Sequence, residues 1–324
     1  MSGVKIAIAE GALGDRTWAT SIADKLGIEL VFGPVESADE IAATSSGCDA
    51  VMVSLHKMTA EKFSRLPATV KCLGRLGVGL DSIDLVAAAE FKIPVIFQPM
   101  YALNEVANHA AAMILTLHRG LWQATNTTRN GEWIQAIQIA EVASLQDSSL
   151  GVIGCGRIGR NLIEKMQPFV KEVVGYDPMV TEPIPGVTMV RNLDELLEKC
   201  KFISLHAPYM PSTHHIIGKR ELALMPKGSI LVNVSRGGLI DEEALVAALE
   251  SGHLDGAGLD VFETEPLPLD SVLRRTKNLL ISPHMAWYSQ SSGSRLVEWG
   301  VRDVFAFING EKVQFGQFAA GPFN

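Results

Sequence analysis

Short apolar runs alternate with amphipathic stretches along most of this chain, and this pattern predicts parallel strands joined by helices. In the first hundred residues the expected strands are 5–9, 28–32, 50–53, 72–76 and 95–97. Helical spacing of apolar positions predicts helices at 15–26, 38–44, 60–66 and 82–91. Thr59 and Asp81 are the expected N-caps of the last two helices.

The alternation continues after a long predicted helix at 104–121 and a polar, glycine-containing loop at 125–133. Further strands are expected at 150–153, 173–176, 202–205, 229–234, 256–260 and 279–282.

The final predicted helix, 294–308, has an apolar face that needs a sheet to cover, and the sheet of the N-terminal part has one incomplete side. We therefore expect the chain to return to its first domain, which makes that domain discontinuous. The expected fold class is α/β, with two Rossmann/flavodoxin-like, doubly wound parallel-sheet domains and an interdomain cleft.

The stretch 149–177 reads as a strand, a glycine turn, a helix and a second strand that ends in an acid. Gly154, Gly156 and Gly159 would allow a sharp turn, close approach of backbone N–H groups to a pyrophosphate, and tight packing of the helix on the strand. Asp177 stands where it would accept hydrogen bonds from the adenosine ribose and repel a 2′-phosphate. No Arg or Lys follows within three residues, so NAD is favoured over NADP. A purely structural βαβ turn is the alternative.

Ligands of such sheets bind beyond the carboxyl ends of the strands, so the residues after each strand are the candidates for chemistry. Besides Asp177, the expected cofactor contacts are therefore residues of the glycine turn and residues near other strand ends: Gly154, Gly156, Arg157, Ile158, Gly159, His206, Pro208, Val234 and Ser235.

Composition restricts the class of protein without naming it. The 324 residues suffice for two domains with cores of their own, and the net charge of -8 comes from interspersed acids and bases, unlike a nucleic-acid or membrane-binding footprint. The four cysteines are far apart, so neither a disulfide framework nor a metal site is expected. A strand pattern begins by Lys5 and no apolar run is long enough to span a membrane, so we expect a cytoplasmic protein.

Three polar residues near strand ends of the second half suggest acid/base chemistry: Arg236, Glu265 and His284. Oxidation of an alcohol by NAD needs a group that takes the hydroxyl proton, and histidine suits this task near neutral pH. A carboxylate bonded to the imidazole would fix its tautomer, and a guanidinium would bind a substrate carboxylate in a bidentate manner. Taken singly, each could be an ordinary surface or core residue.

Two other features are less specific. The turn at 75–81 could hold a small anion on the N–H groups of Val78 and Gly79, or could be only a tight turn. His109 and His118, within the long helix, are expected to be solvated or satisfied in the core rather than ligands.

The motifs LVNVSRGGLID (231–241), LDVFETEP (259–266), SPHMAW (282–287) and GRLGVGLDSID (74–84) resemble the D-isomer-specific 2-hydroxyacid dehydrogenases. The similarity runs from about residue 50 onward. It implies that Arg236 binds the substrate carboxylate and carbonyl, that Glu265 and His284 form the acid/base pair, and that Asp260 contacts the nicotinamide side of the cofactor. The resemblance also implies a substrate-binding domain of residues 1–103 plus 288–324 and an NAD-binding Rossmann domain of residues 104–287.

Within the family, residues 284–289 and Arg75 look most like the C-terminal-binding protein branch. This implies that Trp287 packs on the substrate tail and that Arg75 meets its carboxylate, although Trp287 could equally pack between domains. The segment 98–104 departs from the family's small loop, so Tyr101 is expected to shape the pocket individually, together with Met100.

The resulting hypothesis is an NAD-dependent D-2-hydroxyacid dehydrogenase that works as a 2-oxo acid reductase. The alternatives are an NAD(H)-sensing scaffold without catalysis, as in the C-terminal-binding proteins, and a dehydrogenase of a phosphite-type oxyanion. The small residues of the helix 104–121 would suit a two-fold interface, so a homodimer is expected, with neither nucleic acid nor membrane as a partner.

Overall fold

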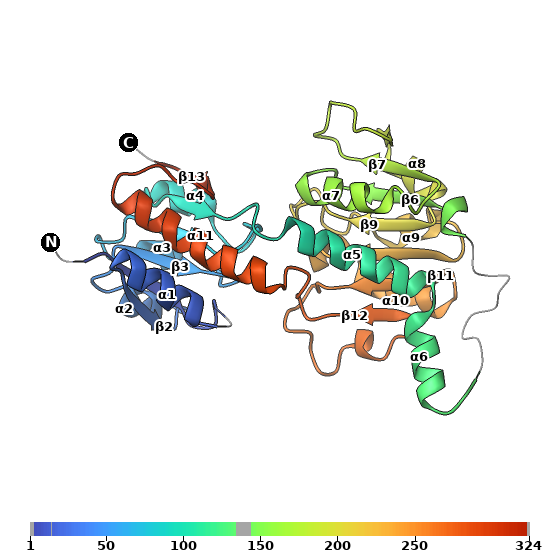
Figure 1. The fold of residues 1–324 in the computed structure, drawn as a ribbon, viewed down its shortest axis with the longest axis horizontal. Coiled ribbons are helices and arrows are strands. Elements are labelled where there is room, and N and C mark those ends of the chain that lie inside the picture. The colour runs from blue at the N-terminus through green and yellow to red at the C-terminus, as the bar shows by residue number, and fades with distance from the viewer. Residues whose placement is uncertain (1–2, 14, 134–143, 323–324) are drawn as a thin grey trace. The chain divides into compact units, whose positions relative to one another are not determined.

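The computed structural model describes residues 3–13, 15–133 and 144–322. By their contacts the residues fall into two compact units: unit 1 is Met1–Ala102 with Tyr288–Asn324, and unit 2 is Leu103–Trp287 (Figure 1). Both are layered α/β structures, as expected.

Unit 1 is built on one six-stranded sheet of order β13-β5-β4-β3-β1-β2, the order of flavodoxin-like folds with one added strand. All pairs are parallel except that of β13 with β5. The strands are β1 (Lys5–Ala9), β2 (Glu29–Gly33), β3 (Ala50–Val53), β4 (Cys72–Arg75), β5 (Val95–Phe97) and β13 (Gln317–Ala320).

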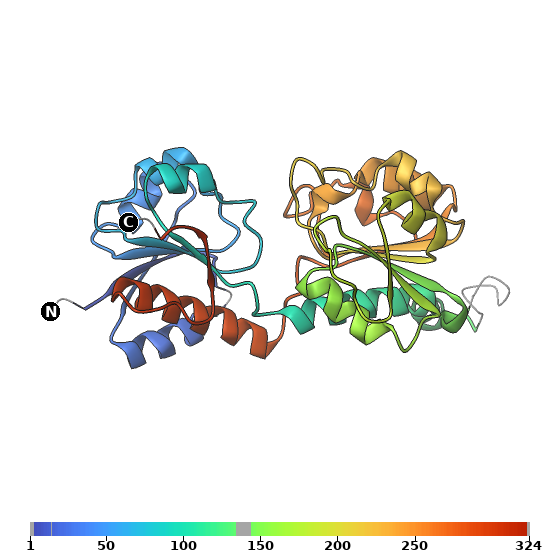
Figure 2. The same cartoon turned by 90° about the horizontal axis from the view of Figure 1, so that it is seen from above.

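Helices cover both faces of this sheet (Figure 2). One face carries α1 (Thr17–Leu26) and α11 (Gln290–Ile308), which pack on each other, with α11 lying on β4 and β5. The other face carries α2 (Ala38–Thr44), α3 (Ala60–Ser64) and α4 (Leu85–Glu90). On this face the early helix α1 packs on β2, and the late helix α11 covers β4 and β5, whose apolar side chains need a helix to bury them.

Asp303, a buried residue of α11, fixes the segment that leads into β13. Its carboxylate accepts backbone N–H groups from Gln314 (2.8 Å), Phe315 (3.2 Å) and Gly316 (2.6 Å), and the side-chain amide of Gln98 (3.1 Å). A buried carboxylate is stable only with such donors, so this residue determines where the chain turns toward the sheet edge.

Unit 2 is built on a seven-stranded, wholly parallel sheet of order β12-β11-β10-β9-β6-β7-β8. Its strands are β6 (Ser149–Ile153), β7 (Glu172–Tyr176), β8 (Val187–Val190), β9 (Phe202–Leu205), β10 (Ser229–Asn233), β11 (Leu254–Leu259) and β12 (Leu279–Ile281). This is the doubly wound order of dinucleotide-binding domains, extended by one strand.

Helices again form a layer on each face of the sheet (Figure 2). On one side lie α5 (Leu103–His118) and α7 (Arg157–Met166), with α6 (Leu121–Arg129) next to α5, and on the other α8 (Leu193–Lys199), α9 (Lys219–Leu224) and α10 (Glu242–Glu250). Two apolar clusters, one for each side, fill the space between helices and sheet. Among the residues with a described placement, no helix is both long and apolar enough to cross a membrane.

The order of the strands reverses between β6 and β9, which brings the glycine turn beside His206. A Cβ atom on Gly154 would meet the backbone of His206 at 2.5 Å, so only glycine fits there. His206 Nε2 contacts Ser204 Oγ at 2.8 Å, and its Nδ1 has no hydrogen-bond partner among the described residues. Burial lowers the pKa of His206 to about 4. The imidazole is thus neutral at the point where such sheets bind ligands.

Two expectations about the elements were wrong. Residues 121–129 form the helix α6, whereas residues from 125 onward were expected in a loop; no residue of α6 is buried, so it has no apolar stripe that a pattern could reveal. The N-cap of α4 is Asp84, whose side chain accepts the N–H of Ala87, and not Asp81. The cause is a bridge between Ile83 and Met58, which holds residues before 84 out of the helix.

Replacing Asp303 tests its role as the anchor of the C-terminal segment. Asp303→Ala should lower the free energy of unfolding by about 3 kcal/mol, because several buried donors lose a charged acceptor. The amides of residues 314–316 should also exchange with deuterium faster, which mass spectrometry of the native protein would detect. Glu311→Ala, at an exposed position, is the matched control. Equal stability of the two variants would show that Asp303 does not hold the C-terminal segment.

His206 should make stability depend on pH. The pKa of His206 in the folded protein lies below the ordinary 6.5. Its contribution to the free energy of unfolding is therefore complete above pH 6.5 and is lost as the pH falls toward about 4. Between about pH 7 and pH 4 the wild type should lose roughly 3 kcal/mol more than His206→Gln. Urea unfolding at both pH values measures this difference. An identical loss in the two proteins would contradict a neutral, buried imidazole.

Candidate active site

The glycine turn of unit 2 ends β6 and begins α7. Gly154 has φ of 92°, and a Cβ atom on Gly159 would lie 2.1 Å from the carbonyl oxygen of Gly154, so both positions require glycine. A Cβ atom on Gly156, by contrast, would meet nothing within 4 Å, so open space lies in front of this residue at the N-terminus of α7. Arg160 of α7 steadies the turn by donating from Nε to the carbonyl of Cys155 (3.0 Å).

Asp177 directly follows β7, and its carboxylate already has two backbone partners. Oδ2 accepts the N–H of Cys155 and Oδ1 that of Met179, both at 2.9 Å. The acid expected to read the ribose therefore also holds the glycine turn in place. The Cys155 thiol takes no part in this, because burial raises its pKa to about 12 and keeps it protonated.

These residues fit a dinucleotide. The open N-terminus of α7 presents backbone N–H groups and the positive end of a helix dipole, which suit a pyrophosphate. The carboxylate of Asp177 retains lone pairs for ribose hydroxyls. His206, with one unsatisfied nitrogen, and Pro208 follow the neighbouring strand β9.

Arg236 is presented by a turn that Asn233 closes. The buried side chain of Asn233 accepts the N–H of Ser235 (3.0 Å) and donates to the carbonyl of Arg236 (2.8 Å). Ser235 Oγ in turn donates to the carbonyl of Leu205 at the end of β9 (2.8 Å). Asn233 was not predicted from the sequence; its position at the last residue of a strand, before a glycine-rich turn, was the available signal.

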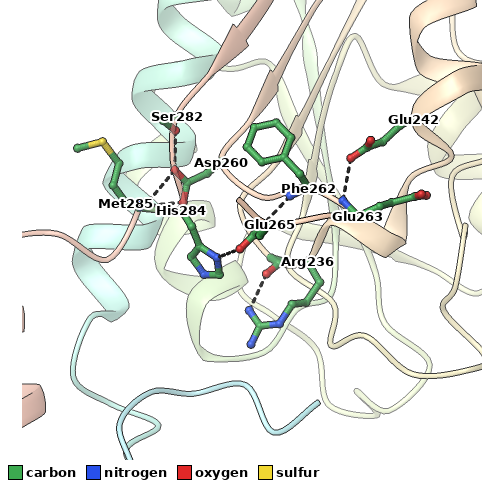
Figure 3. Close-up of polar contacts among 11 residues, drawn as sticks. Arg236, Glu242, Asp260, Phe262, Glu263, Glu265, Ser282, His284 and Met285 are labelled. Atoms are coloured by element: carbon green, nitrogen blue, oxygen red, sulfur yellow. Dashed lines mark hydrogen bonds and ion pairs between the residues drawn. The ribbon is translucent and has the colours of Figure 1, made fainter. Parts of the chain in front are cut away.

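The turn that carries Arg236 lies against the loop that carries Glu265. A Cβ atom on Gly237 would lie 1.9 Å from the backbone carbon of Phe262, so the two segments touch through their main chains. Arg236 Nη1 donates to the carbonyl of Ser235 (2.8 Å), and the guanidinium is one of the positive charges that act on Glu265 (Figure 3).

Glu265 and His284 form a hydrogen-bonded pair, with 2.6 Å between Oε2 and Nδ1 (Figure 3). The other carboxylate oxygen accepts the N–H of Phe262 (2.9 Å). Burial alone raises the pKa of Glu265, but the hydrogen bond and charge of His284, the Phe262 amide and Arg236 outweigh it and bring this pKa below its ordinary value. An ionised Glu265 fixes Nδ1 of His284 as a donor, which leaves Nε2 to exchange a proton.

Asp260 organises the turn on which His284 stands. It is fully buried, and its carboxylate accepts the N–H groups of Met285 (2.9 Å) and Ala286 (2.8 Å) and the hydroxyl of Ser282 (2.5 Å). Its backbone carbonyl accepts the N–H of His284 (2.8 Å). His284 has φ of 51°, a left-handed conformation that few non-glycine residues adopt.

A second ring of polar groups supports the Glu265 loop from behind. Glu242, the first residue of α10, accepts the N–H of Glu263 (2.8 Å), and the Glu263 carboxylate bonds to Nε2 of His215 (2.5 Å). Burial raises the pKa of Glu242, with a contribution from the charges of Glu263 and Glu265. Glu242 was not predicted from the sequence, whereas Glu263 lies within the motif 259–266.

The predicted substrate contacts are divided between the two units. Arg75, Val78, Gly79 and Tyr101 belong to unit 1, whereas Trp287 is the last residue of unit 2. Arg75 is buried, and its guanidinium donates to the carbonyls of Leu76 and, at 2.9 Å, Gly79, so it binds its own turn.

Within the same turn, Val78 is partly exposed. Tyr101 is buried, and its backbone carbonyl accepts a hydrogen bond from Nε of Arg295 (2.9 Å). The roles of these residues toward a substrate stay predictions.

Comparison with known proteins gives consistent results. Residues 111–286 match the family model described as D-isomer specific 2-hydroxyacid dehydrogenase, NAD binding domain. A D-3-phosphoglycerate dehydrogenase of Methanocaldococcus jannaschii is 41% identical over 218 residues, which are 66% of this chain and only 41% of that protein. An (S)-sulfolactate dehydrogenase of Chromohalobacter salexigens is 37% identical over 267 residues, 81% of this chain and 85% of that one.

The fold is also found among solved structures. The NADPH-dependent glyoxylate/hydroxypyruvate reductase of Sinorhizobium meliloti, solved with NADP and malonate, superposes with a TM-score of 0.88 at 26% identity over 100% of this chain and 99% of that one. The family model names NAD as the cofactor of the matched domain, which confirms that expectation. On the match of more than half its residues and on these relatives, the chain belongs to the D-isomer-specific 2-hydroxyacid dehydrogenase family of NAD-binding oxidoreductases.

Proposed function

We propose that this protein is an NAD-dependent reductase of a small 2-oxo acid, with His284 and Glu265 as its acid/base pair and Arg236 as its carboxylate-binding residue. The observation that supports this most is the 2.6 Å pair of His284 with an ionised Glu265, on the same sheet edge as Arg236 and the glycine turn.

The residues of unit 2 have separable tasks in this proposal. The N–H groups at the start of α7 hold the pyrophosphate of the cofactor and Asp177 holds its ribose, while Asp260 is the expected contact on the nicotinamide side. When bound, the cofactor supplies the hydride. Val234, which directly follows β10, remains a predicted cofactor contact.

Arg236 would bind the substrate carboxylate through two parallel N–H bonds and polarise the neighbouring carbonyl. His284 would donate the proton on Nε2 to the carbonyl oxygen during reduction and take it back during oxidation. Glu265 stabilises the charged imidazole and keeps its orientation. Arg75, Val78, Gly79, Tyr101 and Trp287 remain predicted contacts for the rest of the substrate.

The substrate itself is an open part of the proposal. The named relatives act on 3-phosphoglycerate, sulfolactate and glyoxylate or hydroxypyruvate according to their descriptions, and all of these are small 2-hydroxy or 2-oxo acids. A 2-oxo acid with a second anionic group therefore joins the simple and long-tailed acids as a candidate.

The test is oxidation of NADH, followed by absorbance, against a panel of 2-oxo acids. The panel contains glyoxylate, pyruvate, hydroxypyruvate, phenylpyruvate, 4-methylthio-2-oxobutyrate, 3-sulfopyruvate and 3-phosphohydroxypyruvate. We expect turnover of at least one member, and a loss of kcat of roughly 10²- to 10⁴-fold in His284→Asn, because the proton donor is removed.

The same variant should keep its affinity for NADH, measured by quenching of protein fluorescence. A large loss of NADH binding would remove His284 from the acid/base role. If the wild type binds NADH but reduces no member of the panel, a cofactor-sensing scaffold or a phosphite-type oxyanion dehydrogenase becomes the better hypothesis.

Asp177 tests the preference for NAD over NADP. Asp177→Asn removes the charge that repels a 2′-phosphate and keeps an oxygen for the Cys155 N–H, whereas Asp177→Ala loses both. The ratio of kcat/KM for NADPH over NADH should rise roughly tenfold in each variant, the equivalent of about 1.4 kcal/mol. Thermal stability should fall clearly only in Asp177→Ala. An unchanged ratio in both would exclude Asp177 from the ribose role.

A further inference from the structure

A histidine outside the described acid/base pair connects the long helix α5 to the site. His109 lies on α5, partly buried, and its Nε2 is 2.9 Å from Ser282 Oγ. Ser282 Oγ is 2.5 Å from Oδ1 of Asp260, and the imidazole itself is 3.6 Å from the same oxygen. A continuous chain of hydrogen bonds therefore runs from α5 to the buried carboxylate that carries the His284 turn.

The direction of these hydrogen bonds follows from the chemistry of the groups. A carboxylate has no hydrogen to donate, so Asp260, which already accepts two backbone N–H groups, also accepts from Ser282. The single hydroxyl hydrogen of Ser282 is thus used toward Asp260, and its oxygen is left to accept a hydrogen from His109 Nε2. The imidazole of His109 is therefore the first donor of the chain. A side chain without an N–H at position 109 would remove the hydrogen bond to the Ser282 oxygen.

The position of the Asp260 carboxylate matters because the turn that it holds is strained. A residue other than glycine at a φ of 51° is strained, and such a conformation persists only where the surroundings determine it. Both carboxylate oxygens bind N–H groups that directly follow His284. A rotation of the Asp260 side chain would release these N–H groups and let the imidazole move away from Glu265.

His109 is well placed to prevent that rotation, because α5 is a rigid support. Its buried residues pack on β10, β11 and α7, and Met113 lies against Gly258 of β11, two residues before Asp260. We propose that His109 is a positioning residue for His284, acting through Ser282 and Asp260. The inference rests on the proposed function, in which His284 carries the proton.

The experiment compares His109→Leu with His109→Gln, whose amide can supply an N–H at a similar place. The matched control is His253→Leu, because His253 is also partly buried in unit 2 but its imidazole bonds to the carbonyl of Leu222, away from the Asp260 carboxylate. Two quantities are measured for each protein: kcat and KM for the best 2-oxo acid, and deuterium exchange of the amides of residues 285 and 286 without any ligand.

We expect His109→Leu to lower kcat roughly 10- to 100-fold, the effect of a small misplacement of a catalytic group, with KM changed less than about threefold. Exchange at residues 285 and 286 should accelerate. His109→Gln should restore most of the kcat and most of the protection of these two amides. His253→Leu should resemble the wild type in both measurements. Ser282→Ala, which interrupts the chain at its middle, should reproduce His109→Leu and serves as the second variant if the latter folds poorly.

The inference is overturned if His109→Leu keeps kcat within about twofold of the wild type, or if exchange of the two amides is unchanged. A general loss of stability would instead appear equally in His253→Leu and would not be rescued by glutamine. If the wild type reduces no 2-oxo acid, the proposed function fails by itself, and the exchange measurement still decides whether His109 holds the turn.

Discussion

The buried carboxylate of Asp260 is the constraint on which the candidate active site of unit 2 depends. A charge without access to water must be matched by donors, and here the donors come mostly from the chain that follows β12. Satisfying them fixes a left-handed turn at His284 and turns its imidazole toward the second carboxylate of the site. Asp303, which is also buried, solves the same problem in the same way and holds the segment 314–316. The half-buried Asp177 likewise holds the glycine turn through the N–H of Cys155.

Much of this architecture could be predicted from the sequence, since fully buried parallel strands must be continuous apolar runs and the expected strands fall within a residue or two of the observed ones. The glycine turn and the candidates Arg236, Glu265 and His284 could be singled out because the proposed chemistry requires particular side chains near strand ends. Two parallel-sheet units and the family itself were also correctly identified. These features depend on local pattern and on motif order, which a single sequence contains.

What the sequence could not supply depends on contacts between distant residues. His109 looks like any histidine of an amphipathic helix until Ser282, 173 residues later, is seen beside it. The exposed helix α6 has no apolar stripe, and β13 is short and antiparallel to a single neighbour, so neither has a periodic signal. The contacts of Arg75 are of the same kind: its guanidinium donates to carbonyls of its own turn, which the motif does not reveal.

The discontinuity of unit 1 has a consequence for the protein during its synthesis. The strands β1 to β5 leave the ribosome first, but the helix that covers β4 and the strand that pairs with β5 come only after the 185 residues of unit 2. At about 5–20 residues per second, the nascent sheet waits roughly 10–40 s with an apolar face and an open edge. Unit 2, which is continuous, can fold within that interval. The half-finished first domain is therefore the part of the nascent chain that most needs a chaperone.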